Sequence, residues 1–482
     1  MPLRLRPALV LALVLSLGVP AALRAQAAET EPSDPRALAR AILAEMVAIR
    51  TTDSAGHTDQ AARAAERRLL AAGFPAEDVR IVEVTPGKFS LVARYRGTAG
   101  SGLKPVLMLA HMDVVDAWRQ DWSFEPFELR EQDGWYYGRG ATDNKAGVAT
   151  LLANFIRWKR EGWTPARDFV MALTADEETS SDAIKGLVTK YRELVDAEYA
   201  LNTDAGGGEL HDGRPRVFTV QSAEKTYQTF TLEVRDRGGH SSVPQPSNAI
   251  YRLAAGLERL ARFRFPVHLN ETTRAYFERS AATQAPALAR DMRAVARSNG
   301  ADTAAARRLA AAEPLFNALL RTTCVATRLA AGHADNALPQ SARATVNCRI
   351  LPNEAIEATE ATLRRVLADT AIQITRAVRD VPPGPASPLR ADVMGPIERL
   401  AAAMWPGVTV VPEMSTGATD GGYARSAGIP TYGVSAVFDV IDDVRAHGRD
   451  ERIGVKAFED AVEFWYRLGK AVGTLPNSRP PA

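Results

Sequence analysis

The chain has 482 residues, of which 46% are hydrophobic and 24% are charged, and its formal net charge is +2. This composition excludes wholesale disorder, and the near-neutral charge gives no electrostatic reason to expect nucleic acid or an anionic membrane surface as a partner. The length suggests two or three domains of ~150 residues each. Because the chain has only two cysteines, it has neither a disulfide scaffold nor a cysteine zinc site.

The first 27 residues have the pattern of a secretory signal. Arg4 and Arg6 precede an apolar run from Ala8 to Leu17, and Ala25-Gln26-Ala27 offers small residues for cleavage. The apolar run is too short for a membrane span, and no later segment offers ~20 uninterrupted apolar residues. We therefore expect an exported protein, periplasmic or secreted, with no membrane segment after signal cleavage.

The first half of the mature chain alternates helices with apolar strands. Asp34 and Pro35 are residue types that favour a helix N-cap and a first helical position, and they predict a helix to about residue 50. Further elements are expected as helices at 59–73 and 143–160 and as strands at 79–84, 89–95, 105–111 and 167–174. This alternation predicts a sheet flanked by helices.

After residue 223 the pattern becomes that of a smaller domain. Its elements follow the order β-α-β-β-α-β, at 226–234, 248–262, 322–329, 342–351, 353–367 and 372–377. An alanine-rich and charged stretch, 266–321, interrupts this order and is expected to form additional helices. The α/β pattern resumes after Pro382, with helices at 391–403 and 455–472 and strands at 408–411 and 431–437. We expect a discontinuous catalytic domain, 28–223 and 384–482, with a second domain inserted at 224–383.

The two cysteines occupy neighbouring strands of the predicted insert. Cys324 and Cys348 are equally far in sequence from residue 336, which lies in the turn region between the two β-like runs. A symmetric hairpin would place them opposite one another, so we predict a cross-strand disulfide in an oxidising compartment.

The functional site is expected where the buried strand 105–111 ends. His111 and Asp113 follow its apolar residues, and in an open α/β sheet the carboxyl ends of the strands border the crevice in which ligands bind. We interpret His111 as a metal ligand and Asp113 as the carboxylate that holds its ring. A pair that merely hydrogen-bonds a loop is the alternative, and the pair taken alone favours that alternative.

Four more groups of metal-type ligands lie outside the insert, each where an element begins or ends. They are Asp143 after Gly138-Arg139-Gly140, the pair Glu177 and Glu178, Asp204, and His447. Each carboxylate alone is more simply explained as a helix cap or a solvated loop charge. Together, two imidazoles and three or four carboxylates are the ingredients of a two-metal site, which suits Zn²⁺ and which Co²⁺ or Mn²⁺ could also fill.

These motifs, together with Gly-Gly-His-Ser-Ser at 238–242, carry a family resemblance. The chain resembles the aminoacylase and carboxypeptidase family of di-zinc metallopeptidases over nearly its whole mature length. Residues 118–127 and 414–432 are most similar to the carboxypeptidase S-like branch. The resemblance implies an α/β fold class: a di-zinc exopeptidase catalytic domain, with a mixed sheet flanked by helices, and an inserted ferredoxin-like α+β lid or dimerisation domain, called the lid below.

The resemblance also implies the roles of the metal-type residues. Asp143 bridges two Zn²⁺ ions, of which one is completed by His111 and Asp204 and the other by Glu178 and His447. Two cations ~3.5 to 4 Å apart lower the pKa of a bridging water and polarise the scissile carbonyl. Glu177 is then the general base, which takes the water proton and passes it to the leaving amine.

Four further residues are implied to contact the substrate. The family uses the histidine that matches His240 to stabilise the tetrahedral oxyanion, often in the site of a partner subunit. Asn336 and Arg349 match positions that hold the substrate's terminal carboxylate, and Gly417 lies in a turn that resembles the loop closing over the substrate. A simple turn role for Asn336 and an exposed strand position for Arg349 are the alternatives.

Some residues receive no site role. His57, His211, His268 and His333 lack partner motifs, and Asp176 is expected to be a loop charge. Ala146 and Ser180-Ser181 stand where glycines are common in the family. These positions shape loops, so they bear on substrate choice more than on hydrolysis.

Three functions remain open on the sequence. The preferred one is an exported di-zinc metallohydrolase that cleaves the amide bond next to a free C-terminal amino acid, in a dipeptide, a peptide or an N-acyl amino acid. An aminopeptidase would need an acidic anchor in place of Arg349, and an inactive binding module would lack ligands. Assembly is also open, because the lid favours a homodimer whereas residues 266–321 could cap the lid and keep the chain monomeric.

Overall fold

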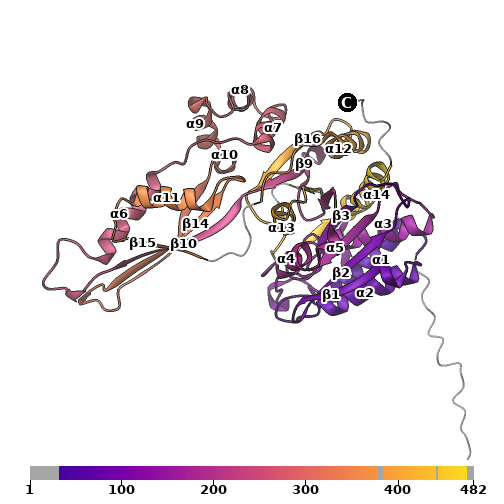
Figure 1. Ribbon diagram of the computed structural model, residues 1–482, viewed down its shortest axis with the longest axis horizontal. Helices are drawn as coiled ribbons and strands as arrows, with labels where there is room; N and C mark the ends of the chain where they lie inside the picture. Colours follow the sequence, from indigo (N-terminus) through magenta and orange to yellow (C-terminus); the bar gives the residue numbers. More distant parts are fainter. Residues whose placement is uncertain (1–31, 378–383, 441–442, 475–482) are drawn as a thin grey trace, which may run out of the picture.

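The computed structural model describes residues 32–377, 384–440 and 443–474 (Figure 1). The predicted signal, 1–27, lies outside these residues. Within them, no helix has both the length and the apolar character needed to cross a membrane. Figure 1 shows two bodies, with the inserted domain extending away from the body that holds both ends of the described chain.

The larger body is built on a mixed ten-stranded sheet. Its strand order is β1 (Val79–Thr85), β2 (Lys88–Tyr95), β6 (Phe169–Thr174), β3 (Val106–His111), β7 (Tyr199–Asn202), β17 (Thr431–Gly433), β9 (Arg214–Glu224), β8 (Gly207–His211) and β18 (Phe438–Val440), with β16 (Thr409–Ser415) paired to β9. The neighbours β6, β3, β7 and β17 run parallel. A small antiparallel sheet joins β4 (Arg130–Gln132), β5 (Trp135–Tyr137) and β19 (Arg452–Gly454).

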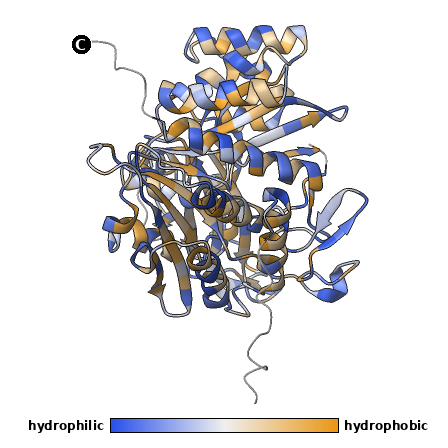
Figure 2. Cartoon of the chain, turned by 90° about the vertical axis from the view of Figure 1, so that its right-hand side faces the viewer, coloured by the Kyte–Doolittle hydropathy of each residue, from blue (hydrophilic) through white to orange (hydrophobic). Residues whose placement is uncertain are grey.

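Helices cover both faces of the large sheet. One face carries α1 (Pro35–Ala48), α2 (Thr58–Ala71), α3 (Lys145–Arg160), α12 (Ala391–Met404) and α14 (Val455–Val472), and the other carries α4 (Asp182–Thr189), α5 (Arg192–Val195) and α13 (Asp420–Ser426). Every residue of β3 is buried, with Met108 in the first core and Leu107 in the second. A strand buried on both faces has to be continuously apolar, as this one is. Figure 2 shows the hydrophobic strands enclosed by helices with hydrophilic outer faces.

The lid is an antiparallel sheet with two helices. Its strand order is β12 (Thr323–Ala331), β14 (Ser341–Ile350), β10 (Thr226–Arg235) and β15 (Gln373–Arg376), and it packs against α6 (Ala249–Arg262) and α11 (Ile356–Leu367). A two-stranded ribbon, β11 (Gly239–His240) with β13 (Ala337–Leu338), adjoins the sheet. The mixed α/β fold class predicted from the sequence is confirmed, including this α+β insert.

The chain passes from the large sheet to the lid at Lys225, the hinge residue between β9 and β10. The stretch expected to be helical forms α7 (Glu271–Ser280), α8 (Pro286–Arg297), α9 (Thr303–Ala312) and α10 (Pro314–Leu320). These helices share a core with Ala223 and Met414 beside this hinge. The helices therefore pack against the hinge rather than against β12. Most of β12 stays exposed at the edge of the lid.

The predicted disulfide is present. Cys324 and Cys348 stand directly opposite one another in the register of β12 and β14, and their Cα atoms are 4.0 Å apart. The prediction succeeded because the two β-like runs pair as a hairpin centred on the turn between them.

Candidate functional site

Three neighbouring parallel strands bring the first site residues together. His111 ends β3 beside Thr174, the last residue of β6, and Leu109 pairs with Asn202, the last residue of β7. The segments that follow β6 and β7 carry Glu177, Glu178 and Asp204. Because parallel strands end at the same edge of the sheet, residues distant in sequence meet there.

The other four predicted metal ligands gather around Asp143. The Nε2 atom of His111 lies 3.0 Å from Oδ1 of Asp143 and 3.4 Å from Oδ1 of Asp204. On the other side, Nε2 of His447 lies 3.2 Å from Oδ2 of Asp143 and 2.9 Å from Oε2 of Glu178. Each oxygen of Asp143 thus faces one imidazole and that imidazole's own carboxylate. This arrangement can hold two cations with Asp143 between them.

Asp113 organises both the histidine and the glutamate pair. The Nδ1 atom of His111 lies 3.0 Å from the Asp113 carbonyl oxygen and 3.5 Å from its Oδ1. The two carboxylate oxygens accept the backbone N–H groups of Glu177 and Glu178, at 3.1 and 3.0 Å. One buried carboxylate therefore lies beside the ring of His111, a predicted metal ligand, and orients the segment that carries the predicted base.

The carboxylates of the site outnumber its two histidines. Burial, and after it the charge of Asp204, raise the pKa of Glu177 to about 10, and burial raises the pKa of Asp204 to about 7. Hydrogen bonds to Asp143 and Glu178 raise the pKa of His447 to about 10. Carboxylates that cannot all ionise together are the donor set that divalent cations stabilise. The residues present therefore fit a pair of hard or borderline cations.

A buried ion pair holds the Asp143 segment, and the sequence reasoning missed it. Glu451 accepts backbone N–H bonds from Gly140, Thr142 and Asp143, at 3.1, 2.9 and 3.0 Å. Its partner Arg139, at 2.6 Å, also donates to the carbonyl oxygens of His447 and Gly448. The pair joins the two segments that supply Asp143 and His447. Arg139 lies in the Gly138-Arg139-Gly140 motif, but nothing near Glu451 in the sequence marks Glu451 as the partner of Arg139.

A second residue was missed behind the metal ligands. Asp420 begins α13, is 3% exposed and accepts a hydrogen bond of 2.5 Å from the Thr174 hydroxyl. Burial raises its pKa to about 8. Asp176 is also buried, because it accepts N–H bonds from Asp182 and Ala183 at the start of α4. Asp176 thus lies in the loop between β6 and α4, as expected, but it is buried rather than solvated.

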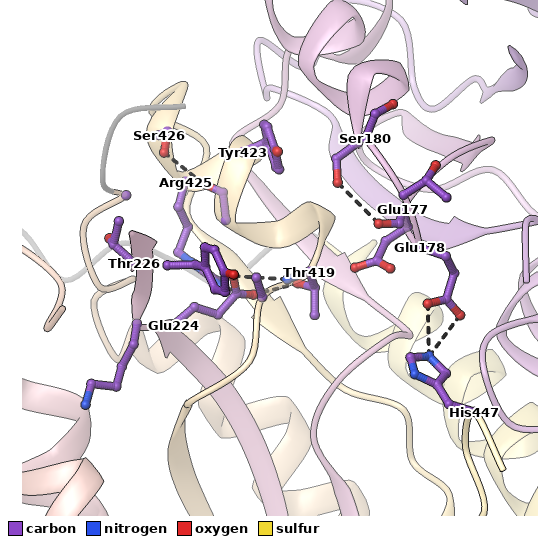
Figure 3. Close-up of a pocket in the computed structure, with 17 residues that line it drawn as sticks. Glu177, Glu178, Ser180, Glu224, Thr226, Thr419, Tyr423, Arg425, Ser426 and His447 are labelled. Carbon is purple, nitrogen blue, oxygen red and sulfur yellow. Dashed lines mark hydrogen bonds and ion pairs between the residues drawn. The ribbon is translucent and has the colours of Figure 1, made fainter. Parts of the chain in front are cut away.

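A pocket of about 310 Å³ runs from the glutamate pair to the hinge (Figure 3). Glu177, Glu178 and His447 lie at one end, and Glu224 and Arg425 lie at the other. Glu224 pairs with Arg425 at 2.6 Å and accepts a hydrogen bond from the Thr419 hydroxyl, so this polar wall is held by its own contacts. The pocket can accommodate a small substrate beside the predicted base.

The predicted substrate residues separate into two groups. Arg349 lies near the pocket, with its guanidinium carbon 4.6 Å from the ring centre of Tyr227, which lines the pocket. Gly417 is exposed, and the next two residues, Ala418 and Thr419, line the pocket.

His240 and Asn336 lie elsewhere. His240 pairs with Ala337, and Ser241 N–H donates to the Asn336 carbonyl, beyond the Arg235 end of β10. The ten residues of β10 span about 30 Å, so this end of the lid is far from the hinge.

His240 has a defined ring form. The backbone N–H of Ser242 donates to Nδ1 of the imidazole at 3.2 Å, and the Ser242 hydroxyl lies 2.8 Å from the same atom. An atom that accepts a backbone N–H carries no proton of its own. The ring proton of neutral His240 is therefore on Nε2, which makes that atom a hydrogen-bond donor.

Comparisons with known proteins agree with this geometry. Residues 107–471 match Peptidase family M20/M25/M40. The human "N-fatty-acyl-amino acid synthase/hydrolase PM20D1" is 29% identical over 374 residues, covering 76% of this chain and 74% of that protein. The "Probable carboxypeptidase S-like 2" of Dictyostelium discoideum is 28% identical over 395 residues, covering 79% and 74%.

A solved structure shares the fold. An "M20 family metallo-carboxypeptidase" from Sulfolobus solfataricus superposes with a TM-score of 0.64 at 18% identity, over 90% of this chain and 99% of that one. The predicted family is thus confirmed, and the carboxypeptidase S-like branch stays a prediction. The chain belongs to peptidase family M20/M25/M40 and is a hydrolase of the peptidase and amidohydrolase type.

Proposed function

We propose that this protein is a two-zinc hydrolase that cleaves the amide bond next to a free C-terminal amino acid. The observation that carries the proposal is Asp143, whose two carboxylate oxygens face two separate histidine and carboxylate pairs. His111 and Asp204 would hold one Zn²⁺, and Glu178 and His447 the other. When bound, the two cations would activate water and polarise the scissile carbonyl.

The residues around the site supply the proton transfers. Glu177 has a ligand atom within 4.8 Å of those of His111 and Asp204, while Asp113 fixes its backbone. A carboxylate held in this position can take a proton from an attacking water and return it to the leaving amine. Glu177 is therefore the proposed general base and, after proton transfer, the acid.

Arg349 is the reason for proposing that the enzyme binds the C-terminal rather than the N-terminal end of its substrate. A guanidinium near the hinge end of the pocket suits a terminal carboxylate, which it can bind with two parallel hydrogen bonds. A free amine would call for an unpaired acid, and the pocket glutamate Glu224 is already paired with Arg425. An N-acetylated dipeptide should be cleaved and a C-terminal amide should not. The reverse result would favour the aminopeptidase alternative.

The relatives narrow the substrate class. The similarity to an N-fatty-acyl-amino acid hydrolase and to carboxypeptidase S-like proteins supports N-acyl amino acids and short peptides as substrates. A screen of both classes with the purified enzyme, after chelation and return of Zn²⁺, tests the proposal. Hydrolysis of neither class would contradict it.

We also propose a homodimer in which the lid completes the partner's site. The Nε2–H of His240 and the side chain of Asn336 are separated from the chain's own pocket by the length of β10, which is about 30 Å. Next to them, β12 is an edge strand with Val325 and Leu329 more than half exposed. An exposed apolar edge strand has unpaired backbone N–H and C=O groups, which can pair with a second copy of the chain.

Export is proposed on two observations. The first 27 residues have the pattern of a secretory signal, and Cys324 and Cys348 are joined. Structural disulfides persist in oxidising compartments such as the periplasm or the cell exterior. Fractionation of cells that express the full chain would test this location.

A further inference from the structure

The lid contains a second cavity, separate from the predicted metal site. Its volume is about 500 Å³, and it lies between the end of α6, the end of α10 and the start of β12. Its walls include the apolar side chains of Leu257, Leu260, Phe263, Phe265 and Val325. The volume falls in the range of ordinary small-molecule sites.

A buried arginine lines this cavity and has no counterion among the residues that the structure describes. Arg321 is 8% exposed, and its Nη1 donates to the Phe265 carbonyl oxygen at 3.0 Å. Among the described residues, its Nε has no hydrogen-bond partner and no carboxylate lies within ion-pair distance of its guanidinium. Burial and the nearby charge of Arg264 lower its pKa, yet a guanidinium stays charged in proteins.

The neighbouring acids are engaged elsewhere. Glu354 accepts hydrogen bonds from the Thr322 hydroxyl and contacts His268, and Glu258 pairs with Arg262 on the outer face of α6. Burying an unpaired charge costs several kcal/mol, so a fold that retains one gains from an anion brought by a ligand. Arg264, which is exposed, adds a second positive charge at the same cavity.

We infer that this lid cavity binds an amphipathic monocarboxylate, such as a medium-chain fatty acid, with its carboxylate on Arg321 and its chain along Leu257, Phe263 and Phe265. A single buried guanidinium matches one carboxylate, which it can bind through two hydrogen bonds. A phosphate group would press further charged oxygens against apolar walls. The inference does not rest on the proposed hydrolysis, because the site is in the lid and its readout is binding.

Photo-crosslinking locates the binding directly. The full-length protein is irradiated with a dodecanoate analogue that carries a diazirine at the end of its chain, and labelled peptides are mapped by mass spectrometry. We expect label in residues 257–265 and 317–326, competition by dodecanoate, and at least tenfold weaker competition by dodecanol, which lacks the charge. Mapping also separates this cavity from the metal site, which can bind carboxylates as well.

Two variants and one control test the role of the cavity. Arg321→Gln should reduce labelling of these peptides at least tenfold, whereas Arg262→Gln, at an exposed arginine that ends α6, should leave it unchanged. If Arg321→Gln does not fold, Ala261→Trp replaces it as the test. The tryptophan fills the cavity from its exposed side and leaves Arg321 intact, so labelling of these peptides should fall.

Three results would overturn the inference. The first is label confined to other peptides, and the second is equal competition by dodecanoate and dodecanol. The third combines two observations: the lid peptides of the wild-type protein stay unlabelled, and Ala261→Trp loses the dimer in light scattering. This result would mean that the cavity is occupied by a second copy of the chain.

Discussion

At the scale of single residues, a variant of Glu177 can distinguish a role in catalysis from a role in metal binding. Replacing Glu177 with glutamine preserves the shape of the side chain but removes its ability to accept a proton. We expect kcat to fall about a hundredfold to ten-thousandfold, the usual contribution of general base catalysis. The zinc content, measured by mass spectrometry of the purified protein, should stay at the wild-type value.

Glu77→Gln is the matched control, because Glu77 is an exposed glutamate near the start of β1. It should retain both turnover and metal. Full activity in Glu177→Gln would remove Glu177 from the mechanism, and a loss of metal would make it a ligand.

Asp143 is the residue on which both proposed cation sites depend. Its two oxygens lie 3.0 Å from the His111 ring and 3.2 Å from the His447 ring. Asp143→Ala should therefore lose both zinc ions, whereas Glu178→Ala should weaken the site at His447 more than the site at His111. Equilibrium dialysis with Zn²⁺ measures the two stoichiometries. One tightly bound zinc in Asp143→Ala would show that Asp143 does not bridge.

At the scale of elements, Glu451 connects the loop before α3 to the loop before α14. The Glu451→Gln variant keeps the size of the side chain but leaves Arg139 as an unpaired buried charge. Breaking a buried pair in this way costs about 3 to 5 kcal/mol of stability. Because the same carboxylate holds the Asp143 backbone, zinc affinity should also fall about tenfold to a hundredfold.

Asp450→Asn is the control for Glu451→Gln. Asp450 is the preceding residue but accepts hydrogen bonds from Ser123, away from the Asp143 segment. We expect zinc affinity in this variant to match the wild type. Equal losses in both variants would mean that the loop responds to any lost carboxylate, and Glu451 would have no specific role.

The disulfide acts within the hairpin of β12 and β14. It links residues separated by 24 positions, and cross-links of such loops stabilise a fold by about 2 to 4 kcal/mol. Reductant should lower the melting temperature of the wild-type lid. The double variant Cys324→Ala, Cys348→Ala should melt lower from the start and should not respond to reductant. A wild-type melting temperature that ignores complete reduction would contradict a stabilising role.

At the scale of the whole molecule, the length of the lid separates His240 from the proposed metal site of the same chain. If the site is completed across a dimer, His240→Ala and Glu177→Gln proteins should each be weakly active and should complement one another when mixed. Random reassortment gives half mixed dimers with one intact site each, or about a quarter of wild-type activity. Steady-state rates after exchange of subunits measure this recovery.

Mixing either variant with itself is the control, and it should recover nothing. Absence of recovery in the mixed sample, with exchange of subunits verified, would place His240 in its own chain's site after a movement of the lid.

Several features could be predicted from residue patterns because they depend on local order. Continuous apolar runs mark the strands that helices cover on both faces, and an element that ends in His111 or Asp204 has its ligand at the edge of the sheet. The disulfide followed from hairpin symmetry alone. The small strands β11 and β13 were not predicted, because a two-residue strand has no periodicity to detect.

Other features could not be predicted, because their partners are far apart in the chain. Glu451 and Asp420 look like ordinary acids in the sequence, and only packing reveals that one holds the Asp143 loop and the other lies behind the ligands. The burial of Asp176 was not predicted for the same reason, since it depends on how α4 packs.

The sequence by itself determined the family, the α/β fold class with its inserted lid, and the residue types available for two cations, because these follow from local periodicity and motif chemistry. Only the tertiary structure decided that Asp143 stands between two histidines and that His240 is separated from the hinge by the length of β10, about 30 Å. It also decided that Arg321 is buried with no carboxylate partner in the described part of the chain. Distances and missing partners depend on where the folded chain passes, and no local pattern of residues encodes them.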